Sequence, residues 1–201
     1  EIPMVTSKML DNNIGYVAVY EFEETTSEQF NQAIDELTAQ GMKGLIIDLR
    51  DNPGGLVNSA TAILDRILTK DQLLVYTVDK NGKKQEEYTE DDETINVPIS
   101  VLINGNSASA SEIVSGCLQD YGKAKLVGTT SFGKGIVQYV LPLGDGSAIK
   151  LTSAKYYTPN GRNIHGTGID PDVEVELNSD SETDTQLEKA QEIVLQEIQA
   201  E

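Results

Sequence analysis

Residues 45–68 read LIIDLRDNPGGLVNSATAILDRIL and decide the fold class. They begin with an almost continuous apolar run, which is the pattern of a strand buried on both faces. The segment Asn52-Pro53-Gly54-Gly55 then has the composition of a turn, and apolar residues from 56 to 68 recur at helical spacing. A buried strand that leads through a turn into a helix is typical of an α/β protein.

Strands and helices alternate along most of the remaining chain. Apolar and β-branched runs predict strands at 15–22, 73–78, 97–103 and 125–127, and helical spacing predicts helices at 26–40 and about 111–121. Turn residues predict two hairpins, one at Asn81-Gly82 and one in which Gly144-Asp145 joins 135–143 to 146–156. The alternation predicts a partly parallel sheet, with functional sites at the carboxyl ends of its strands.

The end of the chain predicts one more helix, at about 182–201. Ser181 with Asp184 three residues later has the spacing of a capping box. The apolar stripe of this helix consists of Leu187, Ala190, Val194 and Ile198. We expect this stripe to pack on the body of the protein while the acidic residues face water.

The charge of the chain argues against nucleic acid as a partner. It has 15 basic and 33 acidic residues, which give a formal net charge of -18. A surface that binds DNA or RNA needs a basic stripe, so both are poor candidates.

The cysteine content and the lengths of the apolar runs exclude further classes of protein. Cys117 is the only cysteine, which excludes an intramolecular disulfide and a cysteine-rich metal site. The chain starts at Glu1 without an apolar leader, and no apolar run approaches the roughly 18 residues of a membrane span. We expect a processed product or an excised piece of a longer protein.

Three serines supply a candidate nucleophile. Ser107, Ser109 and Ser111 follow the predicted strand 97–103 at the start of a helix. Free backbone N–H groups and the helix dipole favour a developing negative charge at that position. Serine is also a preferred helix cap, so the segment alone fits a purely structural role as well.

The usual partners of a nucleophilic serine are poorly placed. His165, the only histidine, lies in the glycine- and asparagine-rich stretch 161–168 and fits a surface loop better than a Ser-His-Asp triad. Cys117 shares the apolar helix face with Ile113 and Val114 and fits a packed core position. A lysine replaces histidine as base when burial lowers the pKa of its ammonium group.

Lys134 is the candidate for such a lysine base. It lies between Gly133 and Gly135, where backbone freedom allows a close approach, and an apolar strand that can carry it inward follows. Gln138, four residues later, lies on the same face of an extended strand and can hold the amine without adding a charge. The alternative is a surface lysine in a glycine loop.

Gly54 and Gly55 are candidate donors to an oxyanion. Two glycines after a buried strand allow N–H groups to point at a bound carbonyl, and the amide after the nucleophile is the natural second donor. The alternative is a tight turn that only starts the helix at Leu56.

Four motifs follow one another in the chain. They are Asp48-Leu-Arg-Asp-Asn-Pro-Gly-Gly55, Gly105-Asn-Ser-Ala-Ser-Ala-Ser-Glu112, Phe132-Gly-Lys-Gly-Ile-Val-Gln138, and Tyr157-Thr-Pro-Asn-Gly161 with Gly168-Ile-Asp-Pro-Asp172. In this order they resemble the catalytic domain of the C-terminal processing peptidases, the tail-specific proteases of serine peptidase family S41. The resemblance spans about residues 15–177.

The resemblance implies specific roles for residues of this chain. Ser109 matches the nucleophile, Lys134 the base and Gln138 the residue that orients the base. The oxyanion donors map to the amide of Ala110 and to one glycine of Gly54-Gly55, of which we prefer Gly55. An aspartate considered catalytic in relatives maps to Asp120. It is left out because eleven helical residues separate it from Ser109 by roughly 16 Å.

The resemblance also implies a fold and a domain organisation. The fold would be an α/β superhelix of the ClpP/crotonase type with a mixed sheet and a C-terminal helix. Residues 1–14 would be a lead-in, 15–177 the peptidase core and 178–201 an acidic C-terminal helix. The PDZ domain that normally precedes the core has no counterpart in the 14 residues upstream of Gly15. Thr129 stands where relatives often have glutamate.

The function implied is that of a serine endopeptidase that cleaves proteins near their C-termini, bound through an extended C-terminal segment. No metal or cofactor is implied, and the location would be extracytoplasmic, in the periplasm, the cell envelope or outside the cell. The alternative is a non-catalytic ligand- or peptide-binding module on the same fold, which has no use for Ser109, Lys134 and Gln138 together. An acyl-CoA hydratase or isomerase would need a CoA site, and the acidic surface suits that anionic cofactor poorly.

Overall fold

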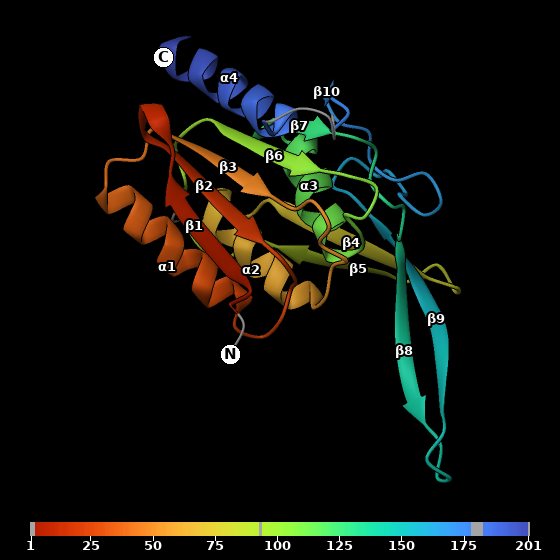
Figure 1. Cartoon of the computed structure of the whole chain (residues 1–201). Coiled ribbons are helices and arrows are strands. Elements are labelled where there is room, and N and C mark those ends of the chain that lie inside the picture. Colours follow the sequence, from red (N-terminus) through yellow and green to blue (C-terminus); the bar gives the residue numbers. More distant parts are fainter. Residues whose placement is uncertain (1–2, 93, 178–182, 201) are drawn as a thin grey trace.

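The strand and helix predicted within 45–68 lie at the centre of the protein. A computed structural model describes residues 3–92, 94–177 and 183–200. In it β3 (Gly44–Asp48) and α2 (Val57–Ile67) form this unit, as Figure 1 shows. All five residues of β3 are buried, which explains an apolar sequence without alternation.

The larger sheet is mixed and has the strand order β1-β2-β3-β6-β7-β10. Its other strands are β1 (Val5–Met9), β2 (Ile14–Val19), β6 (Ile99–Ile103), β7 (Ala124–Gly128) and β10 (Val173–Glu174), with a 3₁₀ turn at Asp11–Asn13. Only β1 runs antiparallel to its neighbour. The sequence did not predict β1 or β10, because β1 is mostly exposed and β10 has two residues.

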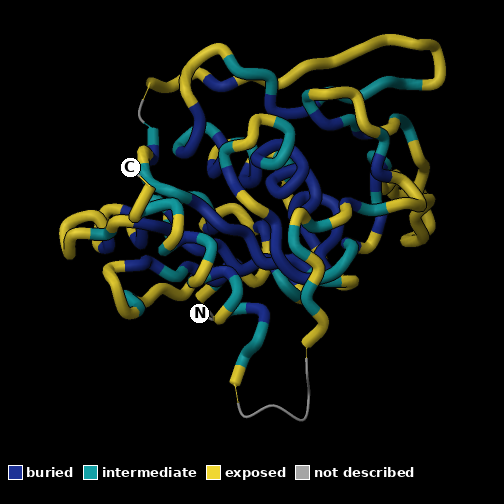
Figure 2. Tube along the Cα trace, turned by 90° about the horizontal axis from the view of Figure 1, so that it is seen from above, coloured by how far each residue is buried: buried dark blue, intermediate teal, exposed yellow. Residues whose placement is uncertain are grey.

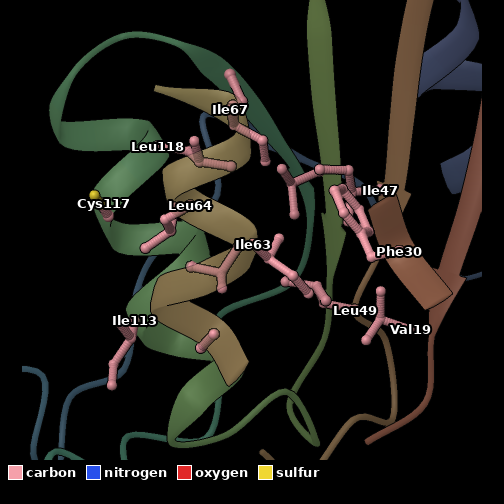
Figure 3. Close-up of a cluster of buried hydrophobic side chains, with 14 of the residues drawn as sticks. Val19, Phe30, Ile47, Leu49, Ile63, Leu64, Ile67, Ile113, Cys117 and Leu118 are labelled. Atoms are coloured by element: carbon pink, nitrogen blue, oxygen red, sulfur yellow. The ribbon is translucent and has the colours of Figure 1, made fainter. Parts of the chain in front are cut away.

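Helices cover both faces of this sheet (Figure 1). α1 (Thr26–Ala39), α2 and α3 (Ala110–Asp120) pack on one face, and their buried side chains form, with sheet residues such as Val19 and Ile47, the cluster drawn in Figure 3. Cys117 lies in this cluster fully buried, and burial raises the pKa of its thiol, so the packed-core interpretation is confirmed. Figure 2 shows the buried segments in the middle of the molecule with exposed loops around them.

The smaller sheet is antiparallel, with the order β5-β4-β9-β8. Its strands are β4 (Leu73–Asp79), β5 (Lys84–Tyr88), β8 (Ile136–Pro142) and β9 (Ala148–Tyr157). Both predicted hairpins are therefore confirmed. β8 begins two residues after Lys134 and projects with β9 away from the body as an arm (Figure 1).

Helix α4 (Thr185–Ala200) packs on the opposite face of the larger sheet. Ser181, the predicted cap, lies outside the described residues, and the described helix is capped instead by Asp184, whose Oδ1 accepts the Leu187 N–H at 3.0 Å. Ala190 and Val194 of the predicted stripe are fully buried. Of the helices in the described ranges, none is long and apolar enough to cross a membrane.

Candidate active site

Ser109 lies in the turn from β6 into α3, at the carboxyl edge of the larger sheet. Its backbone has φ 55° and ψ -111°, outside the regions that residues with a side chain ordinarily occupy. Such a conformation persists only where neighbouring contacts hold it, and it occurs preferentially at functional sites. The residue is 8% exposed, so it is largely but not completely withdrawn from solvent.

The three serines of this turn have different hydrogen-bond partners. The Ser107 hydroxyl donates to Leu49 O at 2.7 Å, and the Ser111 hydroxyl donates to Asn52 O at 3.0 Å. Both therefore hold the turn against the end of β3. Ser109 and Glu112 stand at the capping-box positions of α3, and the Ser109 N–H donates to Glu112 Oε2, while the Ser109 hydroxyl donates to no group in the described part of the chain. The capping and nucleophile interpretations of Ser109 are thus compatible.

Gly54 packs directly against the serine turn. Its φ is +103°, and a Cβ at this position would lie 2.8 Å from the Ser109 Cβ and 2.6 Å from Ala108 O. Only glycine allows this approach. The Gly54 N–H is already used, because it donates to Asn52 Oδ1 at 2.9 Å.

Two N–H groups remain available, that of Ala110 next to Ser109 and that of Gly55 in the segment that packs against the serine turn. Among the residues that the structure describes, no acceptor receives the N–H of Gly55 or that of Ala110. Gly55 has φ +134° and lies in a bridge to Phe22 that leaves its N–H unused. This difference favours Gly55 over Gly54 as the second donor to an oxyanion, together with Ala110.

A buried carboxylate connects the Ser109 turn to the Lys134 loop. Glu112 is fully buried and accepts four hydrogen bonds, two at each oxygen. Oε2 accepts the N–H groups of Ser109 and Lys134, both at 2.8 Å, and Oε1 accepts the Ser131 hydroxyl at 2.6 Å and the Gly133 N–H at 2.7 Å. The backbone nitrogens of Ser109 and Lys134 are therefore no farther apart than twice 2.8 Å.

The Lys134 loop is also packed from its other side. A Cβ at Gly133 would lie 2.9 Å from Gly168 N, and a Cβ at Gly135 would lie 2.6 Å from His165 N. The two glycines thus allow the close approach that the sequence predicted. Lys134 itself is half-buried, and its side chain has no hydrogen-bond partner within the described residues.

Gln138 does not bind Lys134 in this structure. Its Nε2 donates to Thr152 Oγ1 at 3.3 Å, and the register of β8 with β9 shifts between Val137 and Gln138. His165 is exposed, as expected for a loop residue.

Asp120 has a structural role at the far end of α3. Its carboxylate accepts hydrogen bonds from the Arg162 guanidinium and, at 2.8 Å, from the Asn160 N–H. Both partners belong to the loop after β9, so Asp120 holds that loop.

The role of Glu112 was not predicted from the sequence, although its spacing from Ser109 contains a signal. A serine followed three residues later by glutamate at a helix start is the capping-box pattern. The additional bonds to Ser131, Gly133 and Lys134 join segments distant in sequence, and no local pattern predicts them.

We expect Glu112→Gln to destabilise the fold. A carboxamide replaces one accepting oxygen by an NH₂ group that would face two donors, and hydrogen bonds to a charged group contribute about 1.5–3 kcal/mol each. The free energy of unfolding in urea should fall by about 2–4 kcal/mol. Glu28→Gln, which alters an exposed glutamate in the first turn of α1, is the matched control and should change it by less than about 0.5 kcal/mol. Equal stability of the two variants would contradict the described role of Glu112.

These groups together have the composition of a serine acyl-transfer site. Attack on a carbonyl carbon requires a nucleophile, a base and donors to the oxyanion. The site offers the Ser109 hydroxyl, the amine of Lys134 on the adjoining loop and the N–H groups of Ala110 and Gly55, which are free among the described residues. Fold and site thus define an α/β protein with the groups of a serine hydrolase.

Comparison with known proteins gives the family. Residues 13–175 match the model of peptidase family S41, and the chain belongs to this family. It is 42% identical over 180 residues to the carboxy-terminal processing protease CtpB of Bacillus subtilis and 44% identical over 176 residues to the carboxy-terminal-processing protease of Bartonella bacilliformis. The matches cover 87% and 83% of this chain but 38% and 40% of those relatives.

Solved structures agree in fold. The photosystem II D1 C-terminal processing protease is 31% identical, with a TM-score of 0.79 over 96% of this chain and 53% of that protein. A peptidase from Parabacteroides merdae is 26% identical, with a TM-score of 0.80 over 96% of this chain and 65% of that protein.

Proposed function

We propose that this chain is the catalytic core of a serine endopeptidase that cleaves proteins near their C-termini. The observation that carries the proposal is the arrangement around Glu112, which joins the backbone of Ser109 to that of Lys134. Relatives named as carboxy-terminal processing proteases support the reaction and the substrate class.

In the proposed mechanism Ser109 is the nucleophile and Lys134 the general base. The amine of Lys134 in its uncharged form takes the hydroxyl proton, and Oγ attacks the scissile carbonyl carbon. The N–H groups of Ala110 and Gly55 stabilise the oxyanion, and Gly54 supports the loop instead of donating. The Lys134 ammonium gives this proton to the leaving amine, and water, deprotonated by the regenerated amine, then hydrolyses the acyl-enzyme.

We assign Gln138 to the orientation of Lys134. This role requires its amide to turn from Thr152 toward the amine when substrate binds, which the exposed 3.3 Å contact with Thr152 allows at little cost. We also propose that residues 15–177 form a core of the ClpP/crotonase type, with 1–14 as its lead-in and 178–201 as an acidic C-terminal helix.

We assign the capture of the substrate to a part of the full-length protein that lies outside this chain. We propose that a PDZ domain of the full-length protein binds the substrate C-terminus by strand addition. The low coverage of the relatives by this chain is consistent with such a further domain. Family resemblance supports an extracytoplasmic location.

A fluorophosphonate probe tests the proposal against the alternative of a non-catalytic binding module. The probe forms a covalent bond only with an activated serine, so we expect one modification per folded chain, mapped to Ser109 by peptide mass spectrometry. The heat-denatured chain is the control and should not react. A folded chain that stays unmodified, or that is modified at Ser107 or Ser111, would refute the assignment.

A further inference from the structure

Arg50 joins the C-terminal helix to the end of β3. Its Nη2 donates to Asp48 Oδ2 at 2.6 Å and to Asp184 Oδ2 at 2.8 Å, and its Nη1 donates to Asp184 Oδ1 at 3.0 Å. The pair with Asp184 is bidentate, which fixes its geometry as well as its distance. Gln186 Oε1 accepts another bond from Nη1 at 3.0 Å. The Arg50 side chain is only 13% exposed, so solvent screens these contacts little.

Asp184 caps α4 and Gln186 lies in its first turn, and this helix is firmly packed on the larger sheet. Gln186 is buried, and its Nε2 donates to Val175 O at 2.7 Å. A Cβ at Gly44 of β3 would lie 2.3 Å from Val194 Cγ1, so helix and strand are in direct contact. Burial raises the pKa of the Asp184 carboxyl, but the hydrogen bonds and the charge of Arg50, together with the N–H groups of Leu187 and Gln186, give a net lowering of that pKa. The carboxylate form is thus the one that Arg50 holds.

Arg50 stands at the start of segment 50–55, which ends at the proposed oxyanion donor Gly55. The middle of this segment is bound by the serine turn through five hydrogen bonds. Asp51 Oδ1 accepts from Asn104 Nδ2 and Asn106 Nδ2, and the Asp51 N–H donates to Asn104 Oδ1 at 3.0 Å. Asn52 O accepts from Ala108 N and Ser111 Oγ. The start of the segment is bound by α4 through Arg50. The end of the segment is bound to Phe22, whose N–H donates to Gly54 O at 2.8 Å and whose O accepts the Leu56 N–H at 2.6 Å. Attachments at its start, middle and end therefore define its path.

We propose that Asp184 is a positioning residue, which through Arg50 sets the path of segment 50–55 and hence the place of the Gly55 N–H relative to Ser109. The inference rests on the proposed function, because this distance matters for a reaction only if Ser109 attacks a carbonyl whose oxygen Gly55 binds. An oxyanion donor acts in the transition state, so its displacement lowers kcat while substrate affinity changes little.

Asp184→Asn is the informative variant. Asparagine caps a helix as well as aspartate does, so α4 keeps its start, but the charge that faces Arg50 is lost. We expect kcat to fall by about 10- to 100-fold with KM within about threefold. Amide hydrogen exchange in residues 51–56 should become at least about tenfold faster.

Two control variants separate positioning from stability. Val194→Ala weakens the docking of α4 without touching Arg50 and should lower Tm at least as much as Asp184→Asn. Glu188→Gln removes an exposed charge from the same helical turn. Both controls should keep the wild-type kcat and the wild-type exchange in residues 51–56.

A wild-type kcat in Asp184→Asn, or an equal loss of kcat in Val194→Ala, would overturn the proposal. If the wild-type chain hydrolyses no peptide, the proposed function fails by itself, and the exchange measurement still decides the role of Asp184. Faster exchange in residues 51–56 only in Asp184→Asn would then support the link through Arg50, and unchanged exchange would refute it.

Discussion

Ser109→Ala is expected to lower peptide hydrolysis by at least about 1,000-fold, because removal of a catalytic nucleophile leaves only the contribution of binding and oxyanion stabilisation. The fold should survive. Alanine removes one hydroxyl at a helix start, which costs about 1 kcal/mol, and the Ser109 N–H still donates to Glu112. Activity per folded molecule, with the folded fraction taken from circular dichroism, measures the effect.

Ser107→Ala is the matched control for this prediction. Its hydroxyl also lies in the serine turn, but it donates to Leu49 O and accepts the Asn104 N–H at 2.9 Å. The variant should lose about 1–2 kcal/mol of stability and keep its activity per folded molecule within a few-fold. A loss equal to that of Ser109→Ala would reopen which serine attacks.

Lys134→Arg is expected to be as damaging as Lys134→Ala, with kcat/KM at least about 1,000-fold below wild type. Arginine keeps the positive charge and most of the length, yet its guanidinium does not give up its proton in proteins, so it cannot act as a base. Lys125→Arg, on an exposed position of β7, serves as the control and should be neutral. Substantial activity in Lys134→Arg would mean that Lys134 supplies only a charge.

The dependence of the rate on pH is a second test of the hypothesis that Lys134 is the general base. The wild-type rate should increase with pH, because only the uncharged amine accepts the serine proton. His165→Ala should keep this profile, since His165 is exposed on a loop. A profile that changes in His165→Ala would overturn the Ser-Lys assignment.

Elements with a strong apolar pattern could be predicted from the sequence, and elements made by pairing could not. Continuous burial of β3 and helical spacing in α2 are properties of the segments themselves. β5 has no apolar residue except Tyr88 and forms because the Asn81-Gly82 turn folds it back onto β4. β1 likewise depends on the edge that β2 offers.

Some residues of the candidate site could likewise be predicted from a local pattern, and others could not. Ser109 and the two glycines at 54 and 55 lie at strand ends, where a local motif was sufficient to single them out. Four hydrogen bonds to Glu112 connect separate loops, which no spacing rule describes. Gln138 shares a face with Lys134 only in a regular strand, and the register shift between Val137 and Gln138 interrupts the alternation of side chains there.

The most direct test of the central claim is mass spectrometry of an unstructured protein incubated with this chain. The account predicts fragments shortened at the C-terminus that accumulate with time in the wild-type reaction and are missing from the Ser109→Ala reaction. The same fragments at the same rate from both enzymes would contradict it.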